Sequence, residues 1–214
     1  MTRDDVDVAR IVPSARDLSL ALTPGRRSLV LVPFLDASAL DAAEADLARL
    51  VESTRAFATN ATGEAQRTLA RATGDVPLLV TTPATSAEDC QRARYFGADG
   101  VCVPATARGD VEAAILSARS MHMAPLLAVG DDLEASSAVA REARAWLLHG
   151  VDLTLARRAA ALDRRRVLVV DASREGEVSA ATLRALLGLV DALLVPPGLH
   201  RRADYEELAA ELDG

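Results

Sequence analysis

The stretch QRARYFGADGVCVP, residues 91 to 104, indicates the fold of the chain. A helix-like segment ends at Gly97, and a short apolar run begins at Gly100, after Ala98-Asp99. Similar turns followed by apolar runs recur around Gly74 and Gly188. A helix, a tight turn and a buried strand in this order are typical of a parallel sheet covered by helices.

Eight apolar runs are predicted as strands: Ser28–Phe34, Ala56–Asn60, Pro77–Thr82, Gly100–Pro104, Pro125–Val129, Ala145–His149, Val167–Asp171 and Ala192–Val195. Eight Ala-rich amphipathic segments are predicted as helices: Leu40–Ser53, Gly63–Ala72, Ala87–Tyr95, Val111–Met121, Leu133–Arg141, Leu155–Leu162, Ala180–Leu187 and Tyr205–Leu212. Strict alternation of this kind favours a closed (β/α)8 TIM barrel. An open doubly wound sheet is the alternative, but Pro33-Phe34-Leu35-Asp36 replaces the glycine-rich phosphate loop that such a sheet carries after its first strand.

We expect a single barrel domain over residues 12–214, preceded by residues 1–11, which carry no pattern and are expected to fray. A short N-terminal helix is predicted before the first strand. Its start has the character of a capping box at Ser14-Ala-Arg-Asp17, and Pro24-Gly25 ends it.

Composition excludes several classes of function. The 214 residues carry a net charge of −7, which argues against a nucleic-acid partner. No run of 18 apolar residues occurs, so neither a membrane span nor a membrane partner is expected, and a cytoplasmic location is predicted. Cys90 and Cys102 lack metal-ligand spacing, so we expect buried thiols, no metal site and no cofactor. All 24 basic residues are arginine, so no lysine is available for catalysis.

Seven blocks of the sequence resemble indole-3-glycerol phosphate synthase, in that family's order and at its spacing. ARYFGAD, residues 93–99, is the most specific of them; the blocks are 24–38, 76–85, 90–107, 123–134, 146–153, 166–173 and 190–199. The resemblance implies a barrel that makes the indole ring of tryptophan with lysines and glutamates at the carboxyl ends of its strands.

The same resemblance implies that this catalytic set is lost. The family's catalytic positions fall on Leu31, Pro33, Thr81, Ala128 and Ala172, none of which is a useful acid or base near neutral pH. We therefore expect a pseudoenzyme of tryptophan biosynthesis that acts by binding or regulation. A divergent active synthase and a barrel enzyme with a different chemistry remain alternatives.

For a different chemistry, the candidate catalytic residues are His149, Asp131 and Asp171, which end or follow predicted strands. Candidate ligand-binding residues at the same mouth are Asn60, Thr81, Thr82, Ser173 and Gly198. The partner expected there is a protein or a small molecule.

Overall fold

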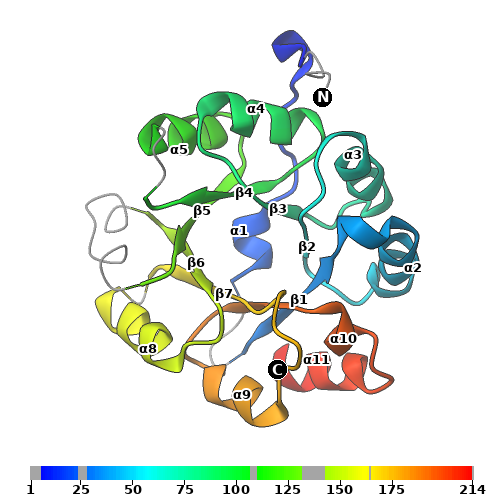
Figure 1. Cartoon of the computed structure of the whole chain (residues 1–214), viewed down its shortest axis with the longest axis vertical. Helices are drawn as coiled ribbons and strands as arrows, with labels where there is room; N and C mark the ends of the chain where they lie inside the picture. Colours follow the sequence, from blue (N-terminus) through cyan, green and yellow to red (C-terminus); the bar gives the residue numbers. More distant parts are fainter. Residues whose placement is uncertain (1–5, 24–27, 107–109, 132–142, 164, 214) are drawn as a thin grey trace.

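The computed structural model describes residues 6–23, 28–106, 110–131, 143–163 and 165–213. Eight parallel strands close into a barrel in the order β1 to β8, and the helices lie outside the ring apart from a short helix that precedes β1 (Figure 1). The strands are β1 (Val30–Leu35), β2 (Phe57–Thr59), β3 (Leu78–Pro83), β4 (Gly100–Pro104), β5 (Ala124–Val129), β6 (Ala145–His149), β7 (Val167–Asp171) and β8 (Ala192–Val195). The predicted (β/α)8 TIM barrel is confirmed.

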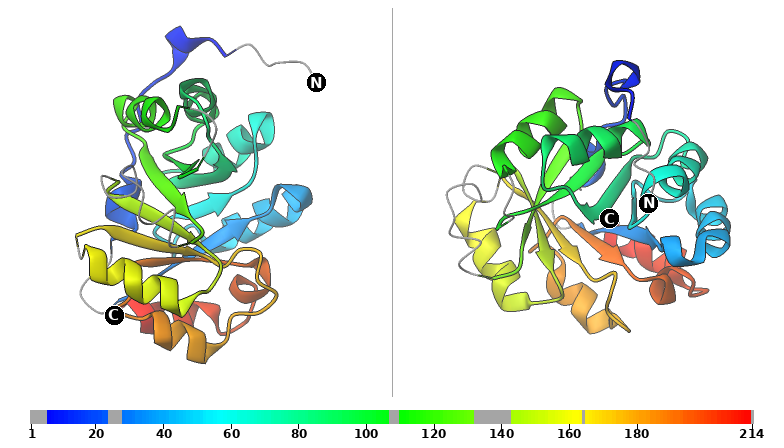
Figure 2. Two further views of the ribbon diagram at one scale, coloured as in Figure 1. Left: turned by 60° about the vertical axis from the view of Figure 1, so that its left-hand side comes forward. Right: turned by 45° about the horizontal axis from the view of Figure 1, so that its top comes forward.

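The helices follow the predicted segments closely. They are η1 (Val8–Arg10), α1 (Leu18–Ala21), η2 (Ala37–Ala39), α2 (Leu40–Leu50), α3 (Gly63–Ala72), α4 (Ala87–Tyr95), α5 (Val111–Ser120), α8 (Leu153–Leu162), α9 (Ala180–Leu186), α10 (Pro197–His200) and α11 (Tyr205–Asp213). The helix predicted at Leu133–Arg141 lies outside the described residues. Both views in Figure 2 show η1 standing beyond the ring on the side of α4.

Each strand is buried on both of its faces, which explains why the strands appear in the sequence as continuous apolar runs. In β1, Val30, Val32 and Phe34 belong to the cluster inside the barrel, whereas Leu31 and Leu35 pack under the helices. Small side chains such as Ala58 complete the interior cluster. This alternation decides which residues can reach a site at the mouth of the barrel.

Helix α1 closes the amino-terminal end of the barrel and lies at the centre of the ring in Figure 1. Its Leu18 and Leu22 are buried in the interior cluster. Asp17 caps the helix by accepting a hydrogen bond from Leu20 N. The predicted capping box at Ser14 is therefore displaced by three residues, because the Ser14 hydroxyl is used elsewhere.

A buried ion network fixes the segment before α1 to the barrel. The Asp99 carboxylate accepts hydrogen bonds from Ser14 Oγ at 2.6 Å and Leu78 N at 2.9 Å. It also lies 2.7 Å from Arg16 Nη2 and 3.1 Å from Arg94 Nη1. Because the carboxylate is fully buried and fully partnered, losing it would leave two guanidinium groups without their anion.

No helix in the described part of the chain is long and apolar enough to span a membrane. Barrel enzymes generally have their active sites at the carboxyl ends of the strands, which here form the mouth at the opposite end of the barrel from α1.

Candidate functional site

The carboxyl ends of the strands supply a mouth that is partly apolar and partly polar. Alternation along the strands turns Phe34, Ala128 and Leu194 into the interior cluster. His149 and Asp171 lie two residues beyond the interior residues Leu147 and Val169, so they continue the inward face at the rim. Two acid–base groups of the mouth therefore lie on the adjacent strands β6 and β7.

His149 and Asp171 form the central pair of the site. They are register partners on adjacent strands, and His149 Nδ1 lies 3.9 Å from Asp171 Oδ2. The His149 side chain is 54% exposed, whereas that of Asp171 is 10% exposed. A charged imidazole at this distance is attracted to the carboxylate, and the exposed ring remains accessible to a substrate.

Ser173 orients the carboxylate of this pair. Its backbone N–H and its hydroxyl both donate to Asp171 Oδ1, at 3.0 and 2.6 Å. Asp171 Oδ2 is the oxygen that is left facing His149. Ser173 was predicted to bind a ligand; the structure shows its hydroxyl engaged with Asp171.

A second carboxylate, that of Glu175, lies near Gly150, the residue that follows His149. Gly150 follows His149 in a left-handed conformation, with φ of 71°, and its N–H donates to Asp171 O. A Cβ at Gly150 would lie 3.5 Å from Glu175 Oε1. Sequence reasoning missed Glu175; the signal available was its position four residues after the end of β7.

On the opposite side of the ring, Asn60 ties the ends of β1 and β2 together. Its Oδ1 accepts from Ala37 N at 2.7 Å, and its Nδ2 donates to Asp36 Oδ1 at 3.1 Å. The N–H of Ser38 and the amide of Asn60 hold the pKa of Asp36 below its ordinary value, against the effect of burial. Asp36 is thus an ionised rim residue, and sequence reasoning did not include it.

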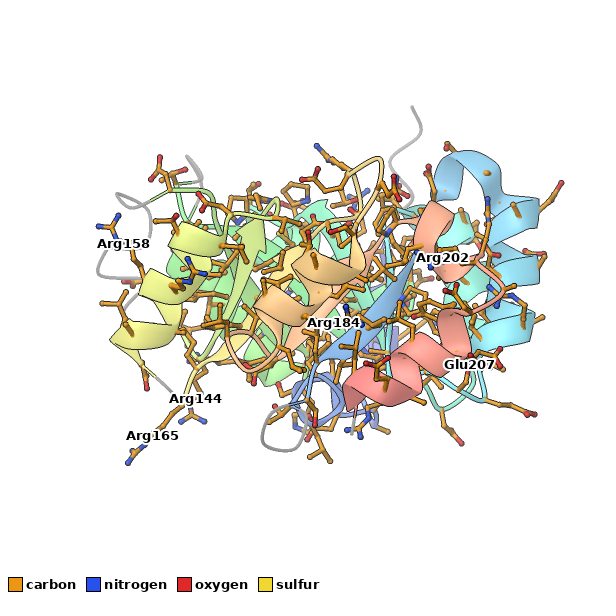
Figure 3. The ribbon with its side chains drawn as sticks, turned by 90° about the horizontal axis from the view of Figure 1, so that it is seen from below. Arg144, Arg158, Arg165, Arg184, Arg202 and Glu207 are labelled. Atoms are coloured by element: carbon orange, nitrogen blue, oxygen red, sulfur yellow. The ribbon has the colours of Figure 1, made fainter. Side chains whose placement is uncertain are left out.

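A cavity of about 240 Å³ lies between the loop after β7 and the segment after β8. Gly176, Glu177 and Val178 line one side, and Gly198, Leu199 and Arg202 line the other. In Figure 3 Arg202 is labelled at the right, higher in the view than Arg144 and Arg165, which precede β6 and β7 and are labelled at the lower left. The predicted residue Gly198 therefore lies in a hollow next to an arginine on the mouth side of the barrel.

The positions taken from the family resemblance do not form a site. Leu31 and Ala172 are buried under the helices rather than inside the barrel. Pro33, between the inward residues Val32 and Phe34, faces outward for the same reason. Ala128 is buried in the interior cluster and has no group for chemistry.

The two predicted threonines are separated. Thr81 donates its hydroxyl to Thr59 O at 3.1 Å, and Thr82 donates to Asn60 O at 3.0 Å. A register shift in β3 between Val80 and Pro83 accompanies this divergence, and Thr82 lines a groove between α3 and α4. Asp131 is exposed directly after β5, at the border of the described residues.

The cysteines have the inert character that was expected. Both are buried, and burial raises the pKa of each thiol to about 12. Neither is a thiolate near neutral pH, so neither is activated for nucleophilic attack. In the described ranges, no three acidic, histidine or cysteine side chains gather as a metal site.

Comparison with known proteins establishes the class of fold. No protein-family model matches the chain, and neither does any curated protein. Solved structures do match over most of the chain, with TM-scores above 0.6 and identities of 20% or less. Similarity at this level shows the barrel fold alone.

Three of these structures are phosphate-ester enzymes by name. 3-Keto-L-gulonate-6-phosphate decarboxylase from Vibrio cholerae has a TM-score of 0.67 at 16% identity, covering 86% of this chain and 95% of that one. 3-Hexulose-6-phosphate synthase from Salmonella typhimurium has 0.66 at 20%, covering 86% and 97%. Orotidine 5'-phosphate decarboxylase from Pyrococcus horikoshii has 0.65 at 13%, covering 86% and 97%.

These comparisons correct the functional prediction. The chain resembles decarboxylase and hexulose-phosphate synthase barrels, so its assignment to the indole-3-glycerol phosphate synthases is wrong. The predicted role as a pseudoenzyme of tryptophan biosynthesis depended on that assignment and is wrong as well. The misleading signal was the helix, turn and strand unit around Gly97, which belongs to barrel architecture in general.

Proposed function

We propose that this chain catalyses proton transfer at a carbon next to a carbonyl or carboxylate group of a small phosphorylated sugar or nucleotide. The observation that carries the proposal is the pair His149 and Asp171, held 3.9 Å apart at the barrel mouth. His149 would act as the acid–base group, and Asp171 would stabilise its charged form. We expect the protein to act in the cytoplasm.

The polar groups around the pair fit this chemistry. Histidine is the side chain whose ordinary pKa lies near neutral pH, and it both accepts and returns a proton. The chain has no lysine, so imine formation with a carbonyl substrate is not available to it. The other two histidines are elsewhere: His122 follows α5, and His200 is fully buried.

The cavity beside Arg202 is the proposed place for the phosphate group. Barrel enzymes often bind phosphate between the loops after strands 7 and 8, which are the loops that line this cavity. Arg202 pairs with the exposed Asp204, so an incoming phosphate would exchange one exposed carboxylate for a doubly charged group. Pro196 and Pro197 offer no N–H donors, so the proposed contact is the guanidinium of Arg202, which lines the cavity.

The proposal has a direct test in deuterium exchange. The purified chain is incubated in D₂O with fructose 6-phosphate, ribulose 5-phosphate or orotidine 5'-phosphate, and proton NMR follows exchange of substrate hydrogens and decarboxylation. We expect His149→Gln to lower the rate by about 10²- to 10⁴-fold. We expect Arg202→Gln to raise KM more than it lowers kcat, because the phosphate does not react.

His122→Asn is the control, because His122 is exposed and lies between α5 and the amino end of β5, whereas the proposed site is at the carboxyl ends of the strands. It should leave the rate unchanged. If His149→Gln is as active as the unmodified chain on a compound that exchanges, the acid–base role of His149 is wrong. If none of the three compounds exchanges or binds, the substrate class is wrong.

A further inference from the structure

A second cavity, of about 270 Å³, lies between α3 and α4 and does not include the His149 pair. We call it the α3–α4 cavity; it is lined by Thr62, Gly63, Gln66, Val80, Thr82, Pro83, Ala84, Asp89, Arg92 and Ala93. A single water molecule needs only about 10 to 15 Å³ of such space, so the cavity has room for a small organic ligand. Its polar groups come from both helices and from the end of β3.

Asp89 supplies a fixed negative charge in this cavity. Thr85 N and Thr85 Oγ1 both donate to its Oδ2, at 2.9 and 3.0 Å. Burial raises its pKa, but hydrogen bonds from Thr85 and Ser86 together outweigh burial and lower it. A carboxylate has about four acceptor positions, so Asp89 keeps capacity to bind a ligand donor.

Arg92 supplies a positive charge one helical turn further along. Its Nη2 lies 3.4 Å from Glu88 Oε1, an exposed ion pair of the kind that contributes little stability. Asp89 and Arg92 are three residues apart on α4, which places them on neighbouring positions of one helix face. Asp89 and Arg92 therefore line the same cavity with opposite charges, and the ion pair described for Arg92 is with Glu88 rather than with Asp89.

The rest of the lining suits a small apolar body with hydrogen-bonding groups. Gln66 is 2% exposed, and its Nε2 donates to Ala93 O at 2.7 Å. Val80, Ala84 and Ala93 provide small aliphatic contacts. Two opposite charges next to small aliphatic side chains match a ligand that has both an ammonium and a carboxylate group.

We propose that the α3–α4 cavity binds an α-amino acid with a short aliphatic side chain. Arg92 binds the carboxylate in place of Glu88, Asp89 binds the ammonium group, and Val80 and Ala84 contact the side chain. Thr82, which lines the cavity, donates to Asn60 O, and Asn60 in turn holds the end of β1. Neither His149 nor Asp171 lines the cavity, so the amino acid would bind at a site separate from the proposed reaction.

The test uses L-valine and two matched analogues on the full-length, isotope-labelled chain. Isovalerate keeps the carboxylate and lacks the ammonium group, whereas isobutylamine keeps the ammonium group and lacks the carboxylate. We expect valine to shift the amide signals of Gly63, Gln66 and Ala84 in a saturable manner. Each analogue should bind at least about 10-fold more weakly, because each loses one charge-assisted contact.

Arg92→Met removes the guanidinium and should abolish valine binding. Arg71→Met is the matched control, because Arg71 is an exposed arginine in the last turn of α3 and does not line the cavity. His149→Gln should leave valine binding unchanged, which separates this site from the barrel mouth. Absence of valine-dependent shifts, or isovalerate binding as tightly as valine, would overturn the proposal, and neither outcome depends on a variant that folds.

Discussion

His200 is the residue whose environment is hardest to infer from sequence. It is fully buried beside β1, and its Nε2 lies 3.1 Å from Phe34 O, while its Nδ1 has no hydrogen-bond partner among the described residues. Asp46, Arg201, Arg49 and Tyr205 surround it. Burial lowers its pKa below the ordinary value of 6.5, although the hydrogen bond to Phe34 and the charge of Asp46 act in the opposite direction.

This shift makes stability depend on pH. Below about pH 6.5 the unfolded chain binds a proton at His200 that the folded chain resists, so the free energy of unfolding falls as the pH is lowered from about 7 to 5. Above that range the residue contributes no slope. Urea denaturation of the unmodified chain and of His200→Gln, which stays neutral, measures this contribution as the difference in slope.

His122→Asn is the control for the same experiment, because His122 is exposed and asparagine tolerates its positive φ of 57°. It should keep the pH slope of the unmodified chain. If His200→Gln also keeps that slope, His200 is not the group responsible.

At the scale of elements, α1 and β4 are matched to each other at Gly100. A Cβ at this position would lie 2.2 Å from Leu18 Cδ2 and 3.0 Å from Ala124 O. The glycine is therefore required by the close approach of the closing helix to the strand. The Asp99 network, one residue earlier in the chain, fixes the segment before that helix at the same place.

Gly100→Ala should destabilise the chain by about 1 to 3 kcal/mol, because the new methyl group overpacks a filled interior. Leu18→Ala alone should also destabilise it, and the double variant should lose less than the sum, since the smaller Leu18 replacement relieves the overlap. Urea denaturation of the four chains gives the coupling energy.

Gly176→Ala is the matched control, because nothing lies within 4 Å of a Cβ there. This substitution should change the free energy of unfolding only slightly. Strict additivity of Gly100→Ala and Leu18→Ala would contradict the proposed contact between helix and strand.

At the scale of the whole molecule, closure of the ring makes every strand depend on two neighbours. β1 pairs with β8 over four register positions, from Val30 with Ala192 to Pro33 with Val195, so the two ends of the chain complete one sheet. In addition, Leu29 N donates to Leu212 O at 2.7 Å. No part of the described sheet has a free edge from which local unfolding could begin.

We therefore expect one cooperative unfolding transition. Trp146 is fully buried in β6, with the Arg166 guanidinium 4.1 Å from its ring, and it is the one tryptophan of the chain. Its fluorescence should change at the same urea concentration as the helical circular dichroism signal. Separate midpoints for the two signals would contradict unfolding of the barrel as a unit.

The sequence by itself determined the fold to a large extent. The eight strands were predicted within about two residues, because strands buried on both faces have to be apolar throughout and turns such as the one at Gly97 interrupt them. Ser86 caps α4 by accepting a hydrogen bond from Asp89 N, and serine followed three residues later by an acidic residue is a sequence signal for the start of a helix. These signals depend on residues that are close together in the sequence, so they can be recognised without knowledge of tertiary contacts.

The register of the strands decides which of the predicted site residues can meet. His149 and Asp171 were predicted as site residues because they end predicted strands, and they are register partners, whereas Leu31 and Ala172, which the family resemblance placed at the mouth, face the helices. In a strand buried on both faces, inward and outward residues are equally apolar, so the sequence does not separate them. Contacts between distant segments, such as Ser14 with Asp99 and Thr82 with the α3–α4 cavity, were decided only when the closed barrel brought them together.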